Sequence, residues 1–209
     1  MNQLFDFFLE PYRTATTTNI IIEILAVVFG IASVWYAKKE HILVYPTGII
    51  STALYVYICY QFTLYGDLII NIYYTLMSIY GWYMWTRIIN SHHLEITRTS
   101  KADKLKALGI FVSTAIFVII VYIYFDRFDR LTDYFDTFTT GIFFAAMWLM
   151  ANKKIEHWIL WIGGNIISVP LYFIKGLGFS GIQFTIFLIL AYLGYQSWKK
   201  ALDKPRSIS

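Results

Sequence analysis

The chain has little charge and a single cysteine. Asp, Glu, Lys and Arg make up 14% of its 209 residues, whereas soluble domains have about 25%. Cys59, the one cysteine, excludes an intrachain disulfide framework. In contrast, hydrophobic residues reach 58% and aromatic residues 20%, and the mean hydropathy is +0.56. This composition excludes a soluble domain and predicts an integral membrane protein.

Several motifs of enzymes and metal sites are also missing. No GxxxxGK[ST] phosphate loop is present, and His92-His93 has no HExxH or Cys/His cluster around it. Gly176–Gly181 matches the dinucleotide fingerprint by letter, but it joins two apolar segments, so we interpret it as a turn. We therefore expect no catalytic residues, no cofactor and no metal, and we expect that the chain is not an enzyme.

Apolar segments fill most of the chain. A bilayer core about 30 Å thick needs roughly 20 apolar residues per helix, and the segment 137–151 is the weakest match. We interpret the Asp/Arg cluster 126–136 as a solvated loop and residues 1–18 as an interfacial lead-in. The prediction is an all-α membrane protein with one transmembrane domain, residues 1–209. Its seven predicted spans are 19–37, 43–61, 67–86, 107–125, 137–151, 157–174 and 180–198.

Lysine and arginine are unequally divided between the two sides of these spans. Lys38, Lys39, the loop 87–106, Lys153-Lys154 and the C-terminal tail share one side, which carries 13 of the 17 basic residues. Six spans would remove this asymmetry. Because cytoplasmic loops are rich in Lys and Arg, we expect a cytoplasmic C-terminus and an external N-terminus. The basic residues are orientation signals, so no nucleic-acid partner is expected.

The two ends of the chain resemble each other. Shared composition makes apolar helices look alike, but landmarks in one order favour true repetition. Each copy holds three spans, about 19–86 and 137–198, with the span 107–125 between them, so both copies have the same orientation. Such a 3+1+3 parallel repeat is a transporter design, found in SWEET proteins. Ala32–Trp35, Glu40-His41, Ile49–Ser51, Leu54-Tyr55, Gly81 and Trp85 recur as Ala145–Trp148, Glu156-His157, Ile166–Ser168, Leu171-Tyr172, Gly194 and Trp198.

Polar side chains gather on one face of the sixth span. Trp158, Trp161, Asn165 and Ser168 are spaced i, i+3, i+7 and i+10. Two indoles and an amide suit a flat, hydrogen-bonding ligand, and a cationic ring would add cation–π attraction. Alternatively, the tryptophans are interfacial and Asn165 bonds a neighbouring helix. The spacing leaves both interpretations open.

Three other spans carry candidates. Asp67, Asn71 and Tyr74 are spaced i, i+4 and i+7 on the third span, where Asp67 is more simply a helix cap at the boundary and Asn71 lies deeper. Gln183 lies about one turn into the last span, as a ligand contact or an interfacial residue. On the second span, Tyr45, Ser51 and Tyr55 are weaker candidates.

These motifs resemble the PnuC family of vitamin transporters over residues 20–200. The WxxW at 158–161 is its sharpest part. The resemblance implies seven helices in a 3+1+3 arrangement and facilitated diffusion of nicotinamide riboside, which a cytosolic kinase then traps by phosphorylation. The matching segments are Leu64–Asp67, Asn71–Tyr74, Ile79–Trp85, Glu156–Trp161 with Asn165, Pro170–Tyr172, Lys175–Leu177, and Gly194-Tyr195 with Trp198.

By this resemblance Trp158, Trp161, Asn165 and Asn71 contact the substrate. The family commonly has Asp and Gln where this chain has Asn165 and Asn71, and related members carry thiamine or riboflavin. Thiamine is also a flat cation, so both vitamins stay open. We expect a bacterial inner-membrane uniporter with the vitamin, the lipid bilayer and a cytosolic kinase as partners. A membrane enzyme or assembly subunit without transport is the alternative, and the sequence leaves a homo-oligomer open.

Overall fold

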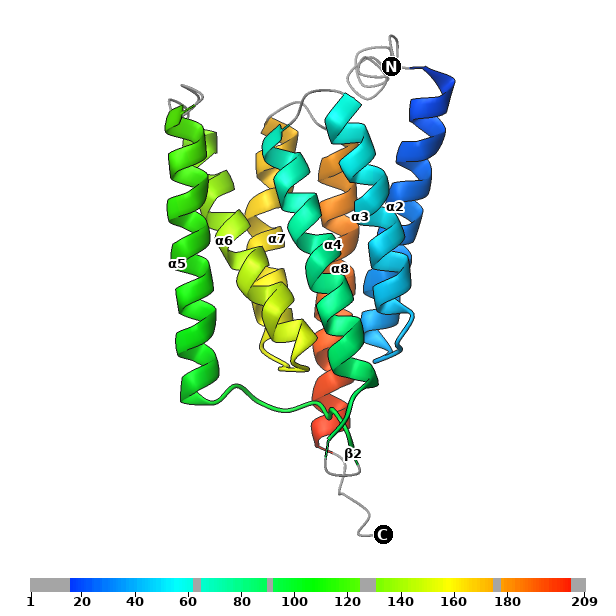
Figure 1. Cartoon of the computed structure of the whole chain (residues 1–209), viewed down its shortest axis with the longest axis vertical. Helices are drawn as coiled ribbons and strands as arrows, with labels where there is room; N and C mark the ends of the chain where they lie inside the picture. Colours follow the sequence, from blue (N-terminus) through cyan, green and yellow to red (C-terminus); the bar gives the residue numbers. More distant parts are fainter. Residues whose placement is uncertain (1–15, 62–64, 90–91, 125–130, 175–177, 204–209) are drawn as a thin grey trace.

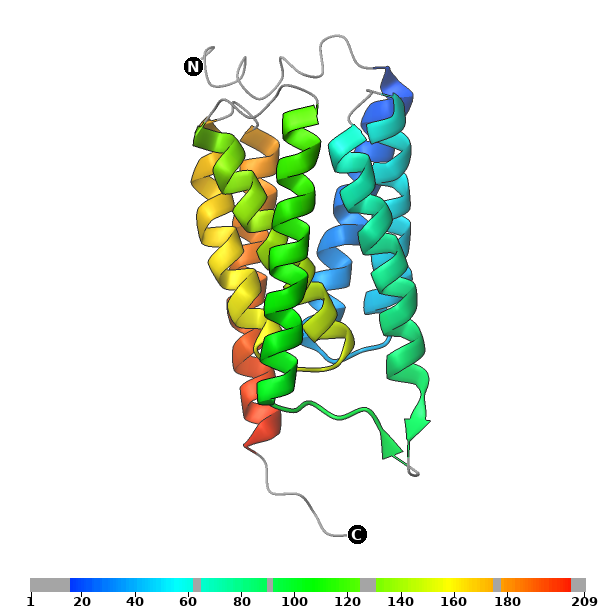
Figure 2. The ribbon, with the colours of Figure 1, turned by 60° about the vertical axis from the view of Figure 1, so that its left-hand side comes forward.

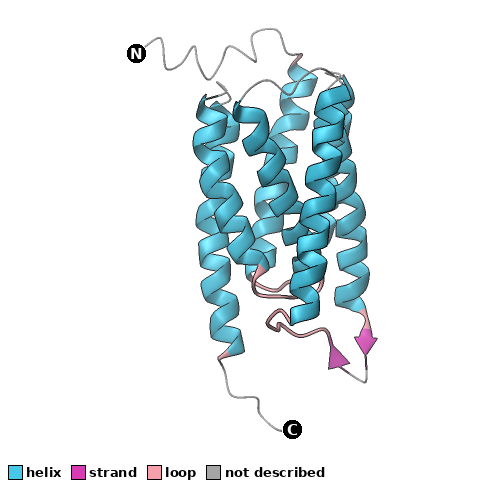
Figure 3. Ribbon diagram, turned by 90° about the vertical axis from the view of Figure 1, so that its left-hand side faces the viewer, coloured by secondary structure: helices cyan, strands magenta, loops and turns pink. Residues whose placement is uncertain are grey.

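The computed structural model describes residues 16–61, 65–89, 92–124, 131–174 and 178–203. Within these ranges the chain forms seven helices that run side by side, and a pair of two-residue strands at one end of the bundle (Figures 1 and 3). The elements are α2 (Thr17–Lys38), α3 (Val44–Gln61), α4 (Tyr65–Thr86), β1 (Ile88–Ile89), β2 (His92–His93), α5 (Lys101–Tyr124), α6 (Leu131–Ala151), α7 (His157–Ile174) and α8 (Gly178–Leu202).

Four of these helices, α2, α5, α7 and α8, are long and apolar enough to cross a membrane. Large apolar side chains on their outer surfaces have no protein cover: Ile24, Leu108 and Ile189 are each more than half exposed. Lipid tails suit such side chains, whereas water does not. The chain is therefore a multi-pass membrane protein.

Helix α7 begins and ends where the predicted span does, but α5 begins six residues before its predicted span. The cause is a capping box at the start of α5. The Ser100 hydroxyl accepts the Asp103 N–H at 3.1 Å, and the Asp103 carboxylate accepts the Ser100 N–H at 2.9 Å. The polar residues before the apolar segment are thus helical, because local side chains satisfy the first N–H groups.

Helix α6 also extends beyond its predicted span. The interpretation of 126–136 as a loop is wrong for residues 131–136, which are helical; 126–130 lie outside the described residues. The hydroxyls of Thr137 and Thr139 donate to the carbonyls four residues earlier, at 2.8 and 2.9 Å. They are satisfied inside the helix, so their polarity does not end it.

The predicted turn at Gly176–Gly181 is wrong for its last four residues. Residues 178–181 form the first turn of α8, whereas 176 and 177 lie outside the described residues. The predicted lead-in at the N-terminus falls on residues that are also outside, apart from 16–18. Of these, Thr16 caps α2 by accepting the Asn19 N–H at 3.3 Å.

The helices form two groups of three. Helix α3 packs on α2 and α4, and α7 packs on α6 and α8. The groups meet where α2 contacts α8 and where α4 contacts α6. Helix α5 packs mainly on α6 and lies at the outer edge of the bundle (Figures 1 and 2).

A buried aromatic cluster fills the end of the bundle at which α2, α4, α6 and α8 terminate, which we call the loop end. Tyr45 meets Trp85 edge-on with ring centroids 5.1 Å apart, and Trp158 meets Trp198 edge-on at 5.9 Å. Gly81 lies one turn before Trp85 and leaves room for the Tyr45 ring. Gly194 stands in the same relation to Trp198: a β-carbon there would lie 2.5 Å from the Trp158 ring.

The two indole N–H groups of this cluster join the helix groups. Trp85 on α4 donates to the carbonyl of Met150, near the end of α6, at 3.3 Å. Trp198 on α8 donates to the carbonyl of Ala37, near the end of α2, at 2.9 Å. Each bond runs from the last helix of one group to the first helix of the other, and it satisfies a carbonyl in the last turn of a helix.

At the loop end, the linker between β2 and α5 contacts the loop that joins α6 to α7. Thr97 pairs with the α6–α7 loop through two backbone bonds of 3.0 Å, to Lys153 and Ile155. The Glu156 carboxylate accepts the Thr99 N–H at 2.8 Å. The linker and the α6–α7 loop are thus held together on one side of the bundle.

Candidate functional site

A cavity of about 220 Å³ lies between the two helix groups, and we call it the central cavity. Its walls come from α2, α3 and α4 on one side and from α6, α7 and α8 on the other; α5 contributes no lining residue. One water molecule needs only about 10–15 Å³ by the same measure. The space is therefore large enough for a small organic molecule.

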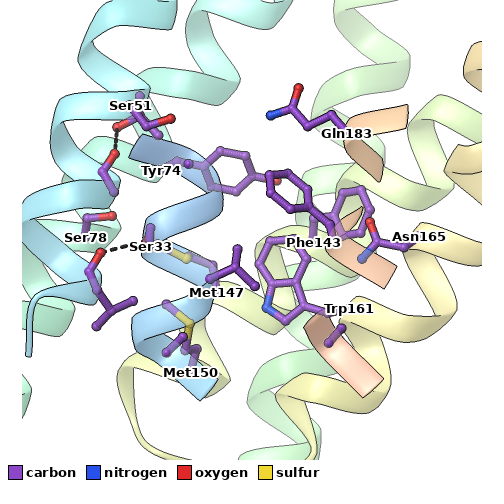
Figure 4. A pocket seen from close by; sticks show the side chains of 18 of the residues that line it. Ser33, Ser51, Tyr74, Ser78, Phe143, Met147, Met150, Trp161, Asn165 and Gln183 are labelled. Atoms are coloured by element: carbon purple, nitrogen blue, oxygen red, sulfur yellow. Dashed lines mark hydrogen bonds between the residues drawn. The ribbon is translucent and has the colours of Figure 1, made fainter. Parts of the chain in front are cut away.

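The second helix group lines the cavity with aromatic rings. Phe143 on α6 stacks on Trp161 of α7, with centroids 5.0 Å apart and an interplanar angle of 23°. Phe184 on α8 stacks beside Phe143, and the centroids of these two rings are 6.2 Å apart. Figure 4 shows Phe143 and Trp161 on the same side of the cavity as Asn165. This wall suits a flat ring, and a cationic ring most of all.

The first helix group lines the cavity with hydroxyl groups. Ser33, Ser51 and Ser78 lie across from the aromatic wall (Figure 4). Two of these serines also tie helices together: Ser33 donates to the Val44 carbonyl at 2.8 Å, and Ser51 donates to the Ala26 carbonyl at 2.7 Å. The hydroxyl oxygens keep acceptor capacity for a ligand after these bonds are made.

Two polar atoms of the lining residues are buried without a partner among the described groups. They are Oδ1 of Asn165 and Nε1 of Trp158, in side chains that are each 1% exposed. An unpartnered buried polar atom costs free energy, so its presence asks for an explanation. The first atom is a hydrogen-bond acceptor and the second is a donor, so each can bond a polar group of a ligand that reaches it.

The described lining of the cavity carries no charged side chain. A phosphate group would lose its hydration there without gaining a cation, which is costly. A monovalent organic cation would find aromatic faces instead. The wall chemistry therefore favours a neutral or cationic ligand over a phosphorylated one.

Six of the seven principal candidates from the sequence line the cavity, as do the weaker candidates Ser51 and Tyr55, whereas Ser168 and Tyr45 do not. Their contact with a substrate stays a prediction, because no ligand contact defines it. The six are Trp158, Trp161, Asn165, Asn71, Tyr74 and Gln183. Asp67 is the exception: it lies exposed in the first turn of α4, outside the lining, and its backbone carbonyl accepts the Asn71 side-chain N–H at 2.8 Å. Gln183 accepts the Tyr55 hydroxyl at 3.3 Å, which joins α8 to α3.

Sequence reasoning missed the contribution of α6. Phe143, Met147 and Met150 all line the cavity, yet they lie in an apolar run without a polar landmark. The serines at 33 and 78 were also missed, since single hydroxyls are common in membrane helices. The repeat landmark Ala145–Trp148 was the available signal on α6, and it includes Met147.

The part of the chain that the structure describes holds no cluster of three His, Cys, Asp or Glu side chains able to bind a metal ion. His92 and His93, which the sequence discounted as a zinc site, form the short strand β2.

Comparison with known proteins agrees with this geometry. The sequence profile of a family described as nicotinamide mononucleotide transporter matches residues 20–200. The nicotinamide riboside transporter PnuC of Escherichia coli is 25% identical over 201 residues, which cover 85% of this chain and 84% of that protein. A transporter of the same name from Neisseria mucosa is 27% identical over 197 residues, 86% of this chain and 72% of its own.

A solved structure has the same fold. It is titled as the crystal structure of the vitamin B3 transporter PnuC and superimposes with a TM-score of 0.67 at 24% identity. The match covers 88% of this chain and 83% of that one.

Proposed function

Because the chain belongs to the nicotinamide mononucleotide transporter family, we propose that it carries nicotinamide riboside across a bacterial inner membrane by facilitated diffusion. The relatives that match it over most of their length are named transporters of nicotinamide riboside. They are not enzymes, and we assign this chain no catalytic role. The observation that carries the proposal is the uncharged central cavity, with aromatic rings on one wall and hydroxyl groups on the other.

The substrate fits the two walls in one orientation. The cationic pyridinium ring stacks on the aromatic surface formed by Phe143 and Trp161. Its carboxamide N–H donates to Oδ1 of Asn165, one of the two buried lining atoms that lack a partner. The ribose then lies toward the first helix group. There, Asn71 supplies an amide and the serines supply hydroxyls.

The unphosphorylated riboside is a better cargo than the mononucleotide after which the family is described. A phosphate would bring about two negative charges into a cavity whose described lining has no cation. The same selectivity favours one-way uptake, because a cytosolic kinase that adds a phosphate makes a product unsuited to the cavity. The kinase is therefore the functional partner of the transporter.

The helices form seven transmembrane spans in a 3+1+3 parallel repeat, with α2–α4 as one copy, α6–α8 as the other and α5 between them. Matching α2 with α6 and α4 with α8 exchanges the α2–α8 contact with the α4–α6 contact, as a two-fold axis along the membrane normal requires. The indole bonds of Trp85 and Trp198 exchange in the same way. These paired features support an internal duplication.

Rocking of one copy against the other would expose the central cavity first to one side of the membrane and then to the other. The loop end faces the cytoplasm in this proposal, because the basic residues Lys38, Lys39, Lys153 and Lys154 lie there and cytoplasmic loops are enriched in lysine and arginine. The N-terminus is then external.

Counterflow in liposomes tests the function. Purified protein is reconstituted into vesicles loaded with unlabelled nicotinamide riboside, and uptake of labelled riboside is followed with and without a protonophore. We expect uptake that the protonophore leaves unchanged. Competition should be strong with the riboside and weak with nicotinamide mononucleotide, and thiamine and riboflavin serve as the parallel vitamins. Empty vesicles are the control.

Two results would contradict the proposal. Uptake of thiamine or riboflavin in place of the riboside would reassign the cargo. A folded protein that moves none of these vitamins would favour a membrane subunit without transport.

A further inference from the structure

Two helices end in the same way at the loop end. Glu40 follows α2 and Lys153 follows α6, and both are left-handed, with φ of 55° and 49°. At each site the residue's own N–H donates at 3.0 Å to the carbonyl three residues earlier. The N–H that follows donates to the carbonyl five residues before it, at 3.0 and 2.9 Å. Both ends are Schellman motifs, whose left-handed position glycine occupies most readily.

The two left-handed residues have opposite charges and contact each other. Lys153 Nζ lies 2.6 Å from Glu40 Oε1, although 113 residues separate them in the chain. The lysine side chain is 9% exposed and the glutamate side chain 35%. The Lys153 ammonium also lies 4.5 Å from the ring centroid of Trp85. A glycine at each site would relieve the backbone strain, so packing alone does not account for a charged pair here.

The pair joins the first helices of the two groups directly beneath the central cavity. Ala37 and Met150, each three residues before a member of the pair, line the cavity. Ala37 is 2% exposed and Met150 7%, so other side chains cover both residues at the loop end. Opening toward the loop end requires the ends of α2 and α6 to separate, and an ion pair of 2.6 Å does not survive such a separation.

We propose that the Glu40–Lys153 ion pair is the gate of the central cavity at the loop end, and that its breaking opens the cavity on that side. The indole bonds of Trp85 and Trp198 reinforce the same closed state, since they also run between the two groups near the ends of α6 and α2. The inference rests on the proposed function for its direction, because the loop end is cytoplasmic only in that orientation.

The test measures how fast a buried cysteine becomes accessible from the loop end. Cys59 is replaced by alanine, and Ala37→Cys supplies the reporter inside the cavity. Labelling by a membrane-impermeant maleimide is followed in liposomes, without any vitamin, for protein molecules whose loop end faces the reagent. The parent carries both cysteine changes only. The test variants are Glu40→Gln, Lys153→Met, the exchange Glu40→Lys with Lys153→Glu, and the double glycine Glu40→Gly with Lys153→Gly.

We expect each neutralised variant to label about tenfold faster than the parent, the change that about 1.4 kcal/mol produces. The charge exchange should restore most of the parent rate. The double glycine variant keeps both helix ends in their preferred conformation, so it should label fast while melting at the parent temperature or above. Lys154→Gln is the matched control: its ion pair with Asp103, at 3.2 Å, lies in the same loop but does not join α2 to α6, so its rate should stay unchanged.

The gate is wrong if Glu40→Gln and the double glycine variant label at the parent rate, or if Lys154→Gln accelerates labelling equally. The gate is also wrong if the charge exchange labels as fast as the single neutralised variants. The labelling experiment needs no vitamin, so it does not depend on the proposed cargo. If the parent moves no riboside in counterflow, the proposed cargo is wrong, but the proposed gate is unaffected.

Discussion

The two helix groups are alike at the loop end, but they differ along the central cavity. At the loop end, Trp85 and Trp198 each follow by one turn a glycine that another aromatic ring covers, and each donates an N–H to the opposite group. Along the cavity, the first group presents hydroxyl side chains, among them three serines and Tyr74, whereas the second presents the apolar rings of Phe143 and Trp161 (Figure 4). The packing is duplicated and the lining is not.

The difference follows from what each region contacts. Both helix groups close the same end of the bundle, so the same packing of aromatic rings and glycines occurs in each group. A small ligand with a flat ring on one side and hydroxyl groups on the other has no such symmetry, so the two walls around it have different side chains. Duplication therefore identifies the framework, and departures from it identify the site.

The largest expected effect tests the duplicated packing. Gly81→Ala and Gly194→Ala each place a methyl group in a buried aromatic ring, that of Tyr45 or Trp158. We expect both to lower the free energy of unfolding by about 1–3 kcal/mol, measured as thermal melting in detergent. Gly163→Ala is the control, because no atom lies within 4 Å of the added carbon. If only one of the two variants is destabilised, the packing of the two helix groups at the loop end is not equivalent.

The next effect tests the aromatic wall. Trp161→Ala removes the ring that stacks on Phe143 and is expected to weaken riboside binding by roughly 1–3 kcal/mol, measured by calorimetry. Trp35→Ala is the matched control, since Trp35 is 41% exposed on α2 and does not line the cavity. Unchanged affinity of a folded Trp161→Ala protein would remove this residue from the site.

A smaller effect concerns the charge of the ligand. Asn165→Asp adds a carboxylate to an uncharged lining, which attracts a pyridinium cation but not neutral riboflavin. We expect the ratio of riboside to riboflavin affinity to rise about tenfold, or about 1.4 kcal/mol. Asn165→Leu provides the control without the charge. Equal ratios in the two variants would show that the pyridinium ring does not bind beside residue 165.

The smallest effect compares two serines at equivalent places in the sequence repeat. Ser51 donates to the Ala26 carbonyl at 2.7 Å, whereas the buried Ser168 hydroxyl has no partner among the described groups. Ser51→Ala should lower stability by about 0.6 kcal/mol, the average for hydrogen bonds between membrane helices. Ser168→Ala should be neutral or slightly stabilising. Equal losses on melting would mean that the two serines share one role.

Much of the fold follows from local sequence. Hydropathy and length predicted the membrane class, and α7 spans the predicted residues 157–174. The i, i+3, i+7 spacing placed Trp158, Trp161 and Asn165 on one face, and the structure brings all three to the cavity. The start of α5 was missed because a capping box extends this helix into polar sequence, and the start of α6 was missed because residues 131–136 are helical although several of them are polar.

The sequence by itself determined that this chain belongs in a membrane, how its apolar segments divide it and which face of α7 is polar, because composition and periodicity are local properties. Only the tertiary structure decided that Phe143 lines the cavity and that Glu40 contacts Lys153 across 113 residues. The physical reason is that lipid and protein interior are equally apolar. The sequence therefore does not indicate whether an apolar side chain contacts lipid or another helix, and only the packing of the helices decides this.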